Sequence, residues 1–237
     1  VADCDVDAAD LHLLLDPQVV RREQFYSGHG AIIDQSLCHQ SGTCRAVCRF
    51  DGVGIRSTQK DATYHIDPIA CEGCGVCVRA CSHHAIAFPV SHCGEWMVSR
   101  TRCGAMVHAR LGVAAENSGK LVSIVRKEAR EMAEAEGRDL VIVDGPPGIG
   151  CPVIASVTGA SRVLIVTEPT VSGEHDLSRV LRLTSHFGIP TAVCINKWDI
   201  NPDMTEHIER LAESGGVLLA GRIPYDPAVT AAQVDML

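Results

Sequence analysis

The chain has 237 residues, of which 46% are hydrophobic and 21% are charged, and its formal net charge is −8. It can bury a full core, as one large domain or two smaller ones. The acidic balance argues against nucleic acid as a partner. No apolar run is long enough to span a membrane or to act as a signal peptide. Twelve cysteines without secretory features indicate a reducing compartment, so we expect a cytoplasmic protein.

The first fifteen residues predict the end of a buried strand that runs into an acidic loop. Asp3, Asp5 and Asp7 lie in this loop. Carboxylates at the carboxyl end of a parallel strand lie where open α/β sheets bind ligands and metals. The loop could therefore position Mg²⁺ or a water molecule, and a solvated acidic turn is the alternative. Residues 17–33 are polar and predict a connecting segment.

The middle of the chain carries a dense cysteine run. Cys71, Cys74, Cys77 and Cys81 form a C-x2-C-x2-C-x3-C sequence. Three thiolates on a tight loop can hold three corners of an iron–sulfur cube, and the fourth reaches a second cube. A zinc knuckle or reduced structural thiols are the alternatives, but zinc sites usually pair two C-x2-C units across a longer gap. The spacing predicts iron–sulfur binding.

An imperfect copy of this run lies upstream, displaced by a constant offset. The copy pairs Cys38 with Cys71, Gly42 with Gly75, Cys44 with Cys77 and Cys48 with Cys81. Such a duplication is typical of a two-cluster ferredoxin, in which each half gives three ligands to its own cluster and one to the other. The copy fails at one position, because Ser41 stands where Cys74 is expected.

The duplication predicts two unlike metal sites. Cys71, Cys74 and Cys77, with Cys48 from the first half, should bind a [4Fe–4S] cluster. The remaining thiolates, Cys38, Cys44 and Cys81, leave one corner at Ser41. A serine oxygen is a poorer ligand for soft iron than a thiolate. We therefore expect [3Fe–4S] or a labile [4Fe–4S] cluster there, and an empty site is the alternative.

The segment after the cysteine runs predicts a helix that begins at Ser118. Its apolar face is made of Val122, Val125, Ala129, Met132 and Ala133. The Gly119-Lys120 pair looks like part of a phosphate-binding loop. A Walker A loop, however, needs glycine in place of Ala114 and serine or threonine in place of Leu121. The sequence therefore contains no Walker A motif here.

A second acidic site is predicted at Asp144. Residues 139–144 form an apolar run that predicts a buried strand, and a sharp turn follows up to Gly148. An aspartate that ends such a strand, followed by a D-x-x-x-G turn, is how nucleotide enzymes hold Mg²⁺ through water and sense the γ-phosphate with a glycine amide. Asp144 and Gly148 are therefore candidate catalytic residues.

The last third shows a clear alternation of strands and helices. We expect strands at residues 162–167, 191–196 and near 217–220, and helices at 173–187 and 203–214. Continuous Val, Ile and Leu strands between amphipathic helices predict a parallel sheet covered on both faces. Asn196, Lys197 and Asp199 follow one strand as N-K-x-D, which predicts a loop that recognises a purine base. This loop alone also suits guanine.

Together these motifs are similar to one family over nearly the whole chain. In order they are Asp3-Cys-Asp-Val, the cysteine repeat, Glu116-Asn-Ser-Gly-Lys, Asp144-Gly-Pro-Pro-Gly-Ile-Gly-Cys-Pro-Val, Thr167-Glu-Pro-Thr and Ile195-Asn-Lys-Trp-Asp. The chain resembles the MinD/ParA-type P-loop ATPases that carry an inserted ferredoxin domain.

The resemblance implies binding of ATP and Mg²⁺. It assigns Asp3 and Asp5 to the switch I acids, Asp144 to the Walker B position and Gly148 to the γ-phosphate sensor. It further implies an adenine contact at Asn196, and Asp226 matches another loop near the base.

The resemblance also implies a domain organisation. Residues 1–33 and 91–237 would form the P-loop ATPase domain, interrupted by a bacterial-type ferredoxin module at 34–90. The family's phosphate loop is absent from the sequence, so we expect a fragment that binds ATP weakly and hydrolyses it negligibly. Ser41 departs from the family's paired four-iron clusters.

We expect a nucleotide-dependent homodimer in which ATP binding and hydrolysis control electron transfer through the ferredoxin module to a redox partner. The alternative is an ATP-dependent carrier that assembles iron–sulfur clusters or delivers them to apoproteins. The open Ser41 site favours this alternative. A role in positioning cellular cargo is weaker, because the sequence shows no amphipathic membrane tail.

Overall fold

The computed structural model describes residues 1–57, 62–112, 115 and 118–235. Contacts divide the chain into two compact units. We call the first the α/β unit, which comprises Val1–Arg22, Trp96–Arg110 and Ser118–Leu237, and the second the cysteine-rich unit, which comprises Glu23–Glu95 and Leu111–Asn117. Ala114, used in the Walker A comparison, and the start of the Glu116 motif lie outside the described residues.

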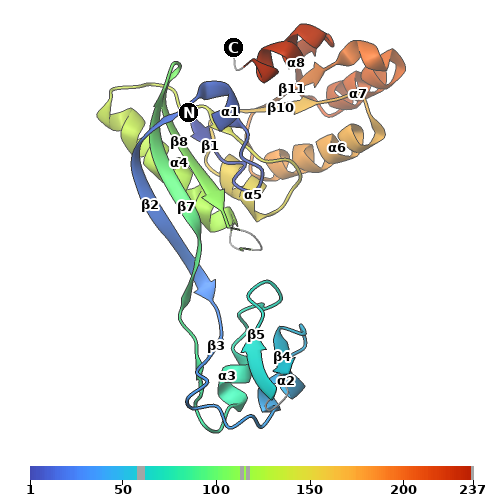
Figure 1. The fold of residues 1–237 in the computed structure, drawn as a ribbon. Helices are drawn as coiled ribbons and strands as arrows, with labels where there is room; N and C mark the ends of the chain where they lie inside the picture. The colour runs from blue at the N-terminus through green and yellow to red at the C-terminus, as the bar shows by residue number, and fades with distance from the viewer. Residues whose placement is uncertain (58–61, 113–114, 116–117, 236–237) are drawn as a thin grey trace. The chain divides into compact units, whose positions relative to one another are not determined.

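A five-stranded sheet has the order β2-β7-β8-β1-β9 (Figure 1). The strands are β1 (Ala2–Asp3), β2 (Gln18–His29), β7 (Val90–Thr101), β8 (Gly104–Leu111) and β9 (Val143–Asp144). The short strand β1 is parallel to both of its neighbours, and Ala2 pairs with Val107 of β8 and with Val143 of β9. The carboxyl ends of β1 and β9 therefore open on the same edge of the sheet.

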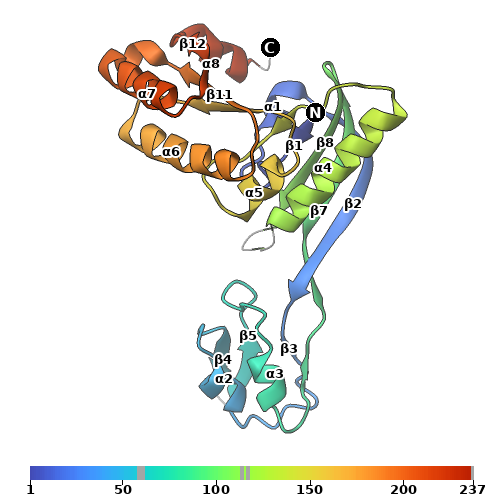
Figure 2. The ribbon, with the colours of Figure 1, turned by 180° about the vertical axis from the view of Figure 1, so that it is seen from behind.

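Helix α4 (Ser118–Ala135) covers one face of this sheet, as the two opposite views show (Figures 1 and 2). Leu121, Val122, Val125 and Ala129 recur at helical spacing and are all buried. Helix α5 (Cys151–Val157) packs against α4, and the short helix α1 (Leu11–Leu15) follows the acidic loop. The predicted helix at Ser118 is confirmed.

A separate three-stranded sheet is fully parallel. Its order is β10 (Val163–Thr167), β11 (Thr191–Asn196) and β12 (Leu218–Ile223). Helices α6 (Val171–His186) and α7 (Pro202–Ser214) bury one face, where Leu177, Val193, Ile195, Ile208 and Ala212 form the core. The other face leaves Leu164, Val166 and Leu218 more than half exposed. The positions of these strands and helices match the sequence expectations closely. The expected cover on both faces was wrong for this sheet, because among the described residues both helices pack on the same face.

The cysteine-rich unit is built from short elements. They are β3 (Ile32–Ile33), α2 (Thr43–Val47), β4 (Val53–Ser57), β5 (Ala62–Ile66), α3 (Val76–Ala80) and β6 (Ile86–Ala87). Strand β3 pairs antiparallel with β6, and β4 pairs antiparallel with β5. The core is small: Ala31, Cys44, Val53 and Ile86 are buried, and several of the other cysteines pack around them.

Two expectations about secondary structure were wrong. Residues 17–33 do not form an irregular connection, because they contain the twelve-residue strand β2 and the strand β3. In β2, Phe25 and Ser27 are buried while their neighbours are exposed, which is the period-two pattern of a strand. The charged residues that hid this pattern are tolerated because β2 is an edge strand.

The apolar run at residues 139–144 is also not a buried strand. Only Val143–Asp144 pairs in the sheet, and Leu140 and Ile142 are 74% and 58% exposed. The physical reason is that β9 is the last strand of its sheet, so no neighbouring strand covers its outer side. Helices η1 (Trp198–Ile200) and α8 (Pro227–Val234) were not predicted.

The structure confirms the predicted fold class, a mixed α/β architecture with parallel strands and a small cysteine-rich module. No helix among the described residues is long and apolar enough to cross a membrane.

Candidate functional site

The internal repeat of the sequence is also a repeat of structure. Helices α2 and α3 are preceded by Gly42 and Gly75, which have positive φ values of 76° and 70°. The two helices end at Cys48 and Cys81, which are both extended. Only glycine adopts the left-handed conformation without strain, so each loop can turn tightly into its helix.

The strands repeat in the same way. The offset that pairs the cysteines also places β3 on the end of β5 and the start of β4 on β6. The β3–β6 pair therefore corresponds to the β5–β4 pair, with the two halves exchanged. This exchange is the arrangement expected when each half contributes its last cysteine to the other half's site.

The predicted four-thiolate set surrounds one pocket in the cysteine-rich unit. Cys48, Cys71, Cys74 and Cys77 all line it, together with Phe50 and other apolar side chains. Burial raises the pKa of Cys77, and the neighbouring Cys71 and Cys74 raise it further. A metal must displace the thiol protons that this crowding retains. The four thiols and their apolar surroundings fit a four-iron cluster.

The predicted three-thiolate set is also drawn together. Burial raises the pKa of Cys44, and Cys38 and Cys81 both add to the rise, as thiols close to each other do. Ser41 is exposed, and its Oγ lies 3.2 Å from Thr43 Oγ1. Within the described ranges, no three His, Cys, Asp or Glu side chains are arranged around a single metal ion.

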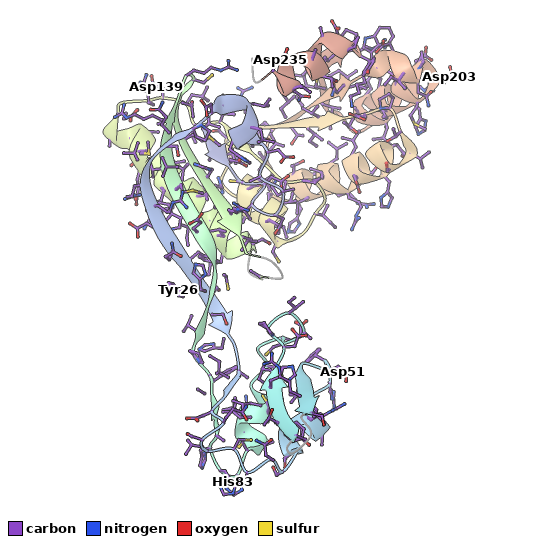
Figure 3. The ribbon with its side chains drawn as sticks, in the orientation of Figure 1. Tyr26, Asp51, His83, Asp139, Asp203 and Asp235 are labelled. Carbon is purple, nitrogen blue, oxygen red and sulfur yellow. The ribbon has the colours of Figure 1, made fainter. Side chains whose placement is uncertain are left out.

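Helices α2 and α3 pack against each other in this unit. His83, which follows Cys81 and is labelled in Figure 3, is exposed and stacks on His39, with ring centroids 3.9 Å apart. The imidazoles thus contact each other on the surface of the unit.

A carboxylate pair lies at the edge of the five-stranded sheet. Asp3 of β1 is directly paired with Asp144 of β9, so both side chains project from the same face. Asp3 is 1% exposed, and its Oδ2 has no hydrogen-bond partner among the described residues. A buried carboxylate oxygen without a partner is costly, so this position suits a cation or an ordered water.

The electrostatics agree with this interpretation. Burial and then the charge of Asp144 raise the pKa of Asp3 from 3.8 to about 6. Burial and then Asp5 raise the pKa of Asp144. The Asp5 N–H donates to Asp3 Oδ1 at 3.3 Å, which orients the loop. Mg²⁺ prefers oxygen ligands of this kind.

Gly148, the predicted γ-phosphate sensor, has φ 88°, and a Cβ at this position would meet no atom within 4 Å. Its conformation favours glycine, and the space beside it is open. The turn that holds it follows Asp144 directly and leads into α5.

The candidate base-recognition loop lies at the carboxyl ends of β10 and β11. Lys197, which has φ 53°, places Nζ 2.6 Å from Glu168 Oε1. Asp199 Oδ1 accepts the N–H of Tyr225 at 2.7 Å. Asp226 accepts the N–H of Ala228 at 2.8 Å and caps α8. Asn196 closes β11 opposite Ile223.

Some residues of these sites were not expected from the sequence. Glu168 pairs with Lys197, and the N–H of Tyr225 binds Asp199. Glu168 lies in a motif noted above, at the end of a strand, so the sequence indicated that it could belong to this site. The sequence could not indicate the backbone N–H of Tyr225, because a backbone contact leaves no side-chain pattern.

Known proteins match both the cysteine-rich segment and longer stretches of the chain. A family model described as "4Fe-4S binding domain" matches residues 64–87. The uncharacterized protein MJ0578 of Methanocaldococcus jannaschii is 31% identical over 200 residues, which cover 84% of this chain and 67% of that protein. A putative septum site-determining protein MinD of Chlorella vulgaris is 28% identical over 116 residues, 45% of this chain and 40% of that protein.

Among solved structures, the MinD cell division protein of Aquifex aeolicus has a TM-score of 0.44 and 20% identity, over 59% of this chain and 58% of that one. The chain thus spans somewhat more than half the length of this structure.

The chain combines parallel strands that end in carboxylates with a segment that matches a 4Fe-4S binding domain, and 45% of it is similar to a putative MinD protein. It belongs to the family of MJ0578 of Methanocaldococcus jannaschii.

Proposed function

We propose that this chain, completed by a phosphate loop that its own sequence does not contain, binds ATP and Mg²⁺ and couples ATP hydrolysis to electron transfer through its ferredoxin module. The observation that carries the proposal is the combination, in one chain, of the Asp3–Asp144 carboxylate pair with a pocket lined by four thiols. The first suits a metal-bound nucleotide, and the second suits a redox cluster.

In this proposal, Asp3, Asp5 and Asp144 hold Mg²⁺ directly or through water. The amide of Gly148 faces the γ-phosphate, and its open surroundings support this role. Asn196 contacts the adenine base, and Asp199 positions the loop through Tyr225. Lys197 and Asp226 would border the base from the neighbouring loops.

The four thiolates of Cys48, Cys71, Cys74 and Cys77 hold the [4Fe–4S] cluster, which supplies one-electron chemistry when bound. Cys38, Cys44 and Cys81 hold the second cluster, with [3Fe–4S] or labile [4Fe–4S] composition because Ser41 offers no thiolate. Their separation into two sets is supported by the pocket, which is lined by the four cysteines of the first set and by none of the second.

Residues 34–90 would form the module, inserted between residues 1–33 and 91–237 of the ATPase domain. Nucleotide binding would order the acidic loop at residues 3–7 and the turn at 144–148, close two subunits and present the module to a redox partner. We place this cycle in the cytoplasm, without nucleic acid or membrane as a partner.

The test measures electron transfer in the intact protein, reconstituted without oxygen. The reduced protein is mixed with a one-electron acceptor, with and without millimolar Mg–ATP, and reoxidation is followed by absorbance. We expect Mg–ATP to change the rate severalfold, and Asp144→Asn to remove this change while the clusters stay bound. Equal rates with and without nucleotide, in a protein shown to bind ATP, would refute the coupling.

A second candidate is an ATP-dependent carrier of iron–sulfur clusters for apoproteins, and the exposed Ser41 corner favours it. The same preparation separates the two functions. A carrier loses its cluster to an apo-ferredoxin in an ATP-dependent way, whereas an electron-transfer protein keeps its iron through repeated cycles.

A further inference from the structure

Helices α4 and α5 contact each other at both ends of α5, and both views show them side by side (Figures 1 and 2). At the first turn of α5, a Cβ added to Gly119 of α4 would lie 3.0 Å from Cys151 Cβ. At the last turn, Arg126 Nη1 donates to the carbonyl oxygens of Ala155 and Thr158, at 2.7 and 2.6 Å. The last carbonyls of a helix lack partners within it, and Arg126 supplies one. A shift of α5 must therefore move α4 or break these contacts.

Helix α5 is also joined closely to the carboxylate pair. The turn that follows Asp144 contains Gly148 and leads directly into α5. A Cβ added to Gly145 would lie 3.1 Å from Ser156 Oγ, so the first residue of the turn packs against the middle of the helix. A ligand that draws this turn towards Asp144 therefore acts on α5 through short contacts.

The next turn of α4 binds two strands of the five-stranded sheet. Glu128 accepts a hydrogen bond from the guanidinium of Arg21, in β2, and forms an ion pair with it. The guanidinium carbon of Arg21 lies 4.7 Å from the centroid of the Trp96 ring, in β7, which is a cation–π contact. The Arg21 side chain thus ties α4 to both β2 and β7.

These contacts lie where the chain leaves the α/β unit and returns to it. Along β2 this unit ends at Arg22, and along β7 it begins again at Trp96. The chain between these two residues forms most of the cysteine-rich unit. Movement of α4 therefore acts on the two strands through which the cysteine-rich unit is covalently attached.

We propose that α4 positions the attachment strands of the cysteine-rich unit according to the state of the nucleotide site, through Arg126 on one side and the Glu128–Arg21 ion pair on the other. This inference rests on the proposed nucleotide site at Asp144. Mg²⁺ and phosphate draw the turn after Asp144 towards them, as switch loops respond to a γ-phosphate. Helix α5 moves with the turn, Arg126 carries the movement to α4, and the ion pair carries it to β2 and β7.

The ion pair can be removed without loss of the fold. The side chains of Arg21 and Glu128 are 48% and 23% exposed. Pairs as exposed as this one contribute little to stability. Glu128→Gln should therefore fold and hold its clusters as the wild type does, so that a changed response to nucleotide reports positioning.

The test is hydrogen exchange, measured by mass spectrometry on the intact protein reconstituted without oxygen, with and without millimolar Mg–ATP. In the wild type, Mg–ATP should change exchange at residues 144–150 and in α5, and also in β2 and β7. Glu128→Gln should keep the change at 144–150 and in α5. In β2 and β7 of this variant, the change should be smaller by roughly threefold or more.

Glu134→Gln is the matched control, because it removes the same charge from an ion pair within α4, between Arg130 and Glu134. This variant should respond as the wild type does. Arg21→Gln and the double variant with Glu128→Gln complete the comparison. Since both side chains act through one contact, the double variant should lose no more of the response than either single variant.

Equal changes in β2 and β7 for the wild type, Glu128→Gln and Glu134→Gln would overturn the role of the ion pair. Strands that never respond while residues 144–150 do would overturn it too, and both outcomes leave the nucleotide site in place. A wild type in which Mg–ATP changes exchange nowhere would refute the nucleotide site and this inference with it. A response of β2 and β7 that depends on Glu128, with electron-transfer rates independent of nucleotide, would refute only the proposed coupling.

Discussion

Asp3 combines three properties at one residue: it is buried, one of its oxygens has no hydrogen-bond partner, and its pKa is raised to about 6. Burial and then the charge of Asp144 raise this pKa, and the hydrogen bond from the Asp5 N–H lowers it. The protonated form is thus favoured in the folded state. The resulting stability is present below pH 4 and is lost as the pH rises through 6.

The direction of this pH dependence leads to a prediction for Asp3→Asn. The amide cannot ionise, so the variant should be more stable than the wild type at pH 7.5, by up to about 3 kcal/mol, and the difference should shrink towards pH 5. Both tryptophans, Trp96 and Trp198, lie in the α/β unit and report its unfolding in urea without divalent ions. A difference that does not vary with pH would contradict the assigned cause.

The same residue should respond to magnesium. A divalent cation at the carboxylate pair removes the penalty of the ionised Asp3, so Mg²⁺ with ATP should stabilise the wild type at pH 7.5. Asp3→Asn should lose most of this stabilisation. Equal stabilisation of the two proteins would show that the cation binds elsewhere.

At the scale of single residues, the sequence predicted which side chains lie close together. It was less successful in predicting the contacts that hold those side chains in place. The spacing of the cysteine repeat predicted the four thiols that line one pocket. The hydroxyl of Tyr64 against Gly42 could not be predicted, because Tyr64 lies outside the repeated cysteine spacing. Contacts that depend on the chain path leave no local pattern.

Among the elements, helix α7 and strand β11 pack together in a regular hydrophobic core. Ile208 is fully buried against Val193 and Ile195, whereas Leu218 of the same sheet is 68% exposed. Ile208→Ala should lower the free energy of unfolding of the α/β unit by about 2–4 kcal/mol, because it leaves a cavity. Leu218→Ala should change it by less than about 0.5 kcal/mol.

Urea unfolding followed by tryptophan fluorescence measures both variants. If both variants lose a similar free energy of unfolding, another surface must cover Leu218 in solution, and this face of β10–β12 is then buried.

Strands and helices were predicted correctly where the hydrophobic pattern of an element agrees with its position in the sheet. Strand β11 was predicted to the residue, since its apolar run is flanked by turns and lies inside its sheet. Strand β2 was missed and residues 139–142 were overpredicted for one reason: both lie at sheet edges. An edge strand tolerates charge, and an apolar run at an edge can remain uncovered, so hydrophobicity misleads in both directions.

For the whole molecule, the two units should differ in their dependence on metal. The cysteine-rich unit has few buried residues and helices of only five residues, so its core cannot hold it folded without the clusters. Removal of iron should raise hydrogen exchange at residues 34–90. Amides of α6, α7 and β11 should keep their protection, since their core contains no cysteine ligand.

Exchange measured by mass spectrometry on holo- and apoprotein tests this difference. The α/β unit serves as the internal control, and unchanged exchange at residues 34–90 would contradict a module held together by its clusters.

The most direct test of the account is anaerobic iron and sulfide analysis combined with low-temperature EPR, on the intact protein as isolated and after dithionite. Two unlike clusters predict about seven irons per chain when the Ser41 corner is vacant. They also predict a three-iron signal in the oxidised protein and a four-iron signal in the reduced one. About four irons, with only the four-iron signal, would mean that Cys38, Cys44 and Cys81 hold no cluster, and the two-cluster path would be contradicted.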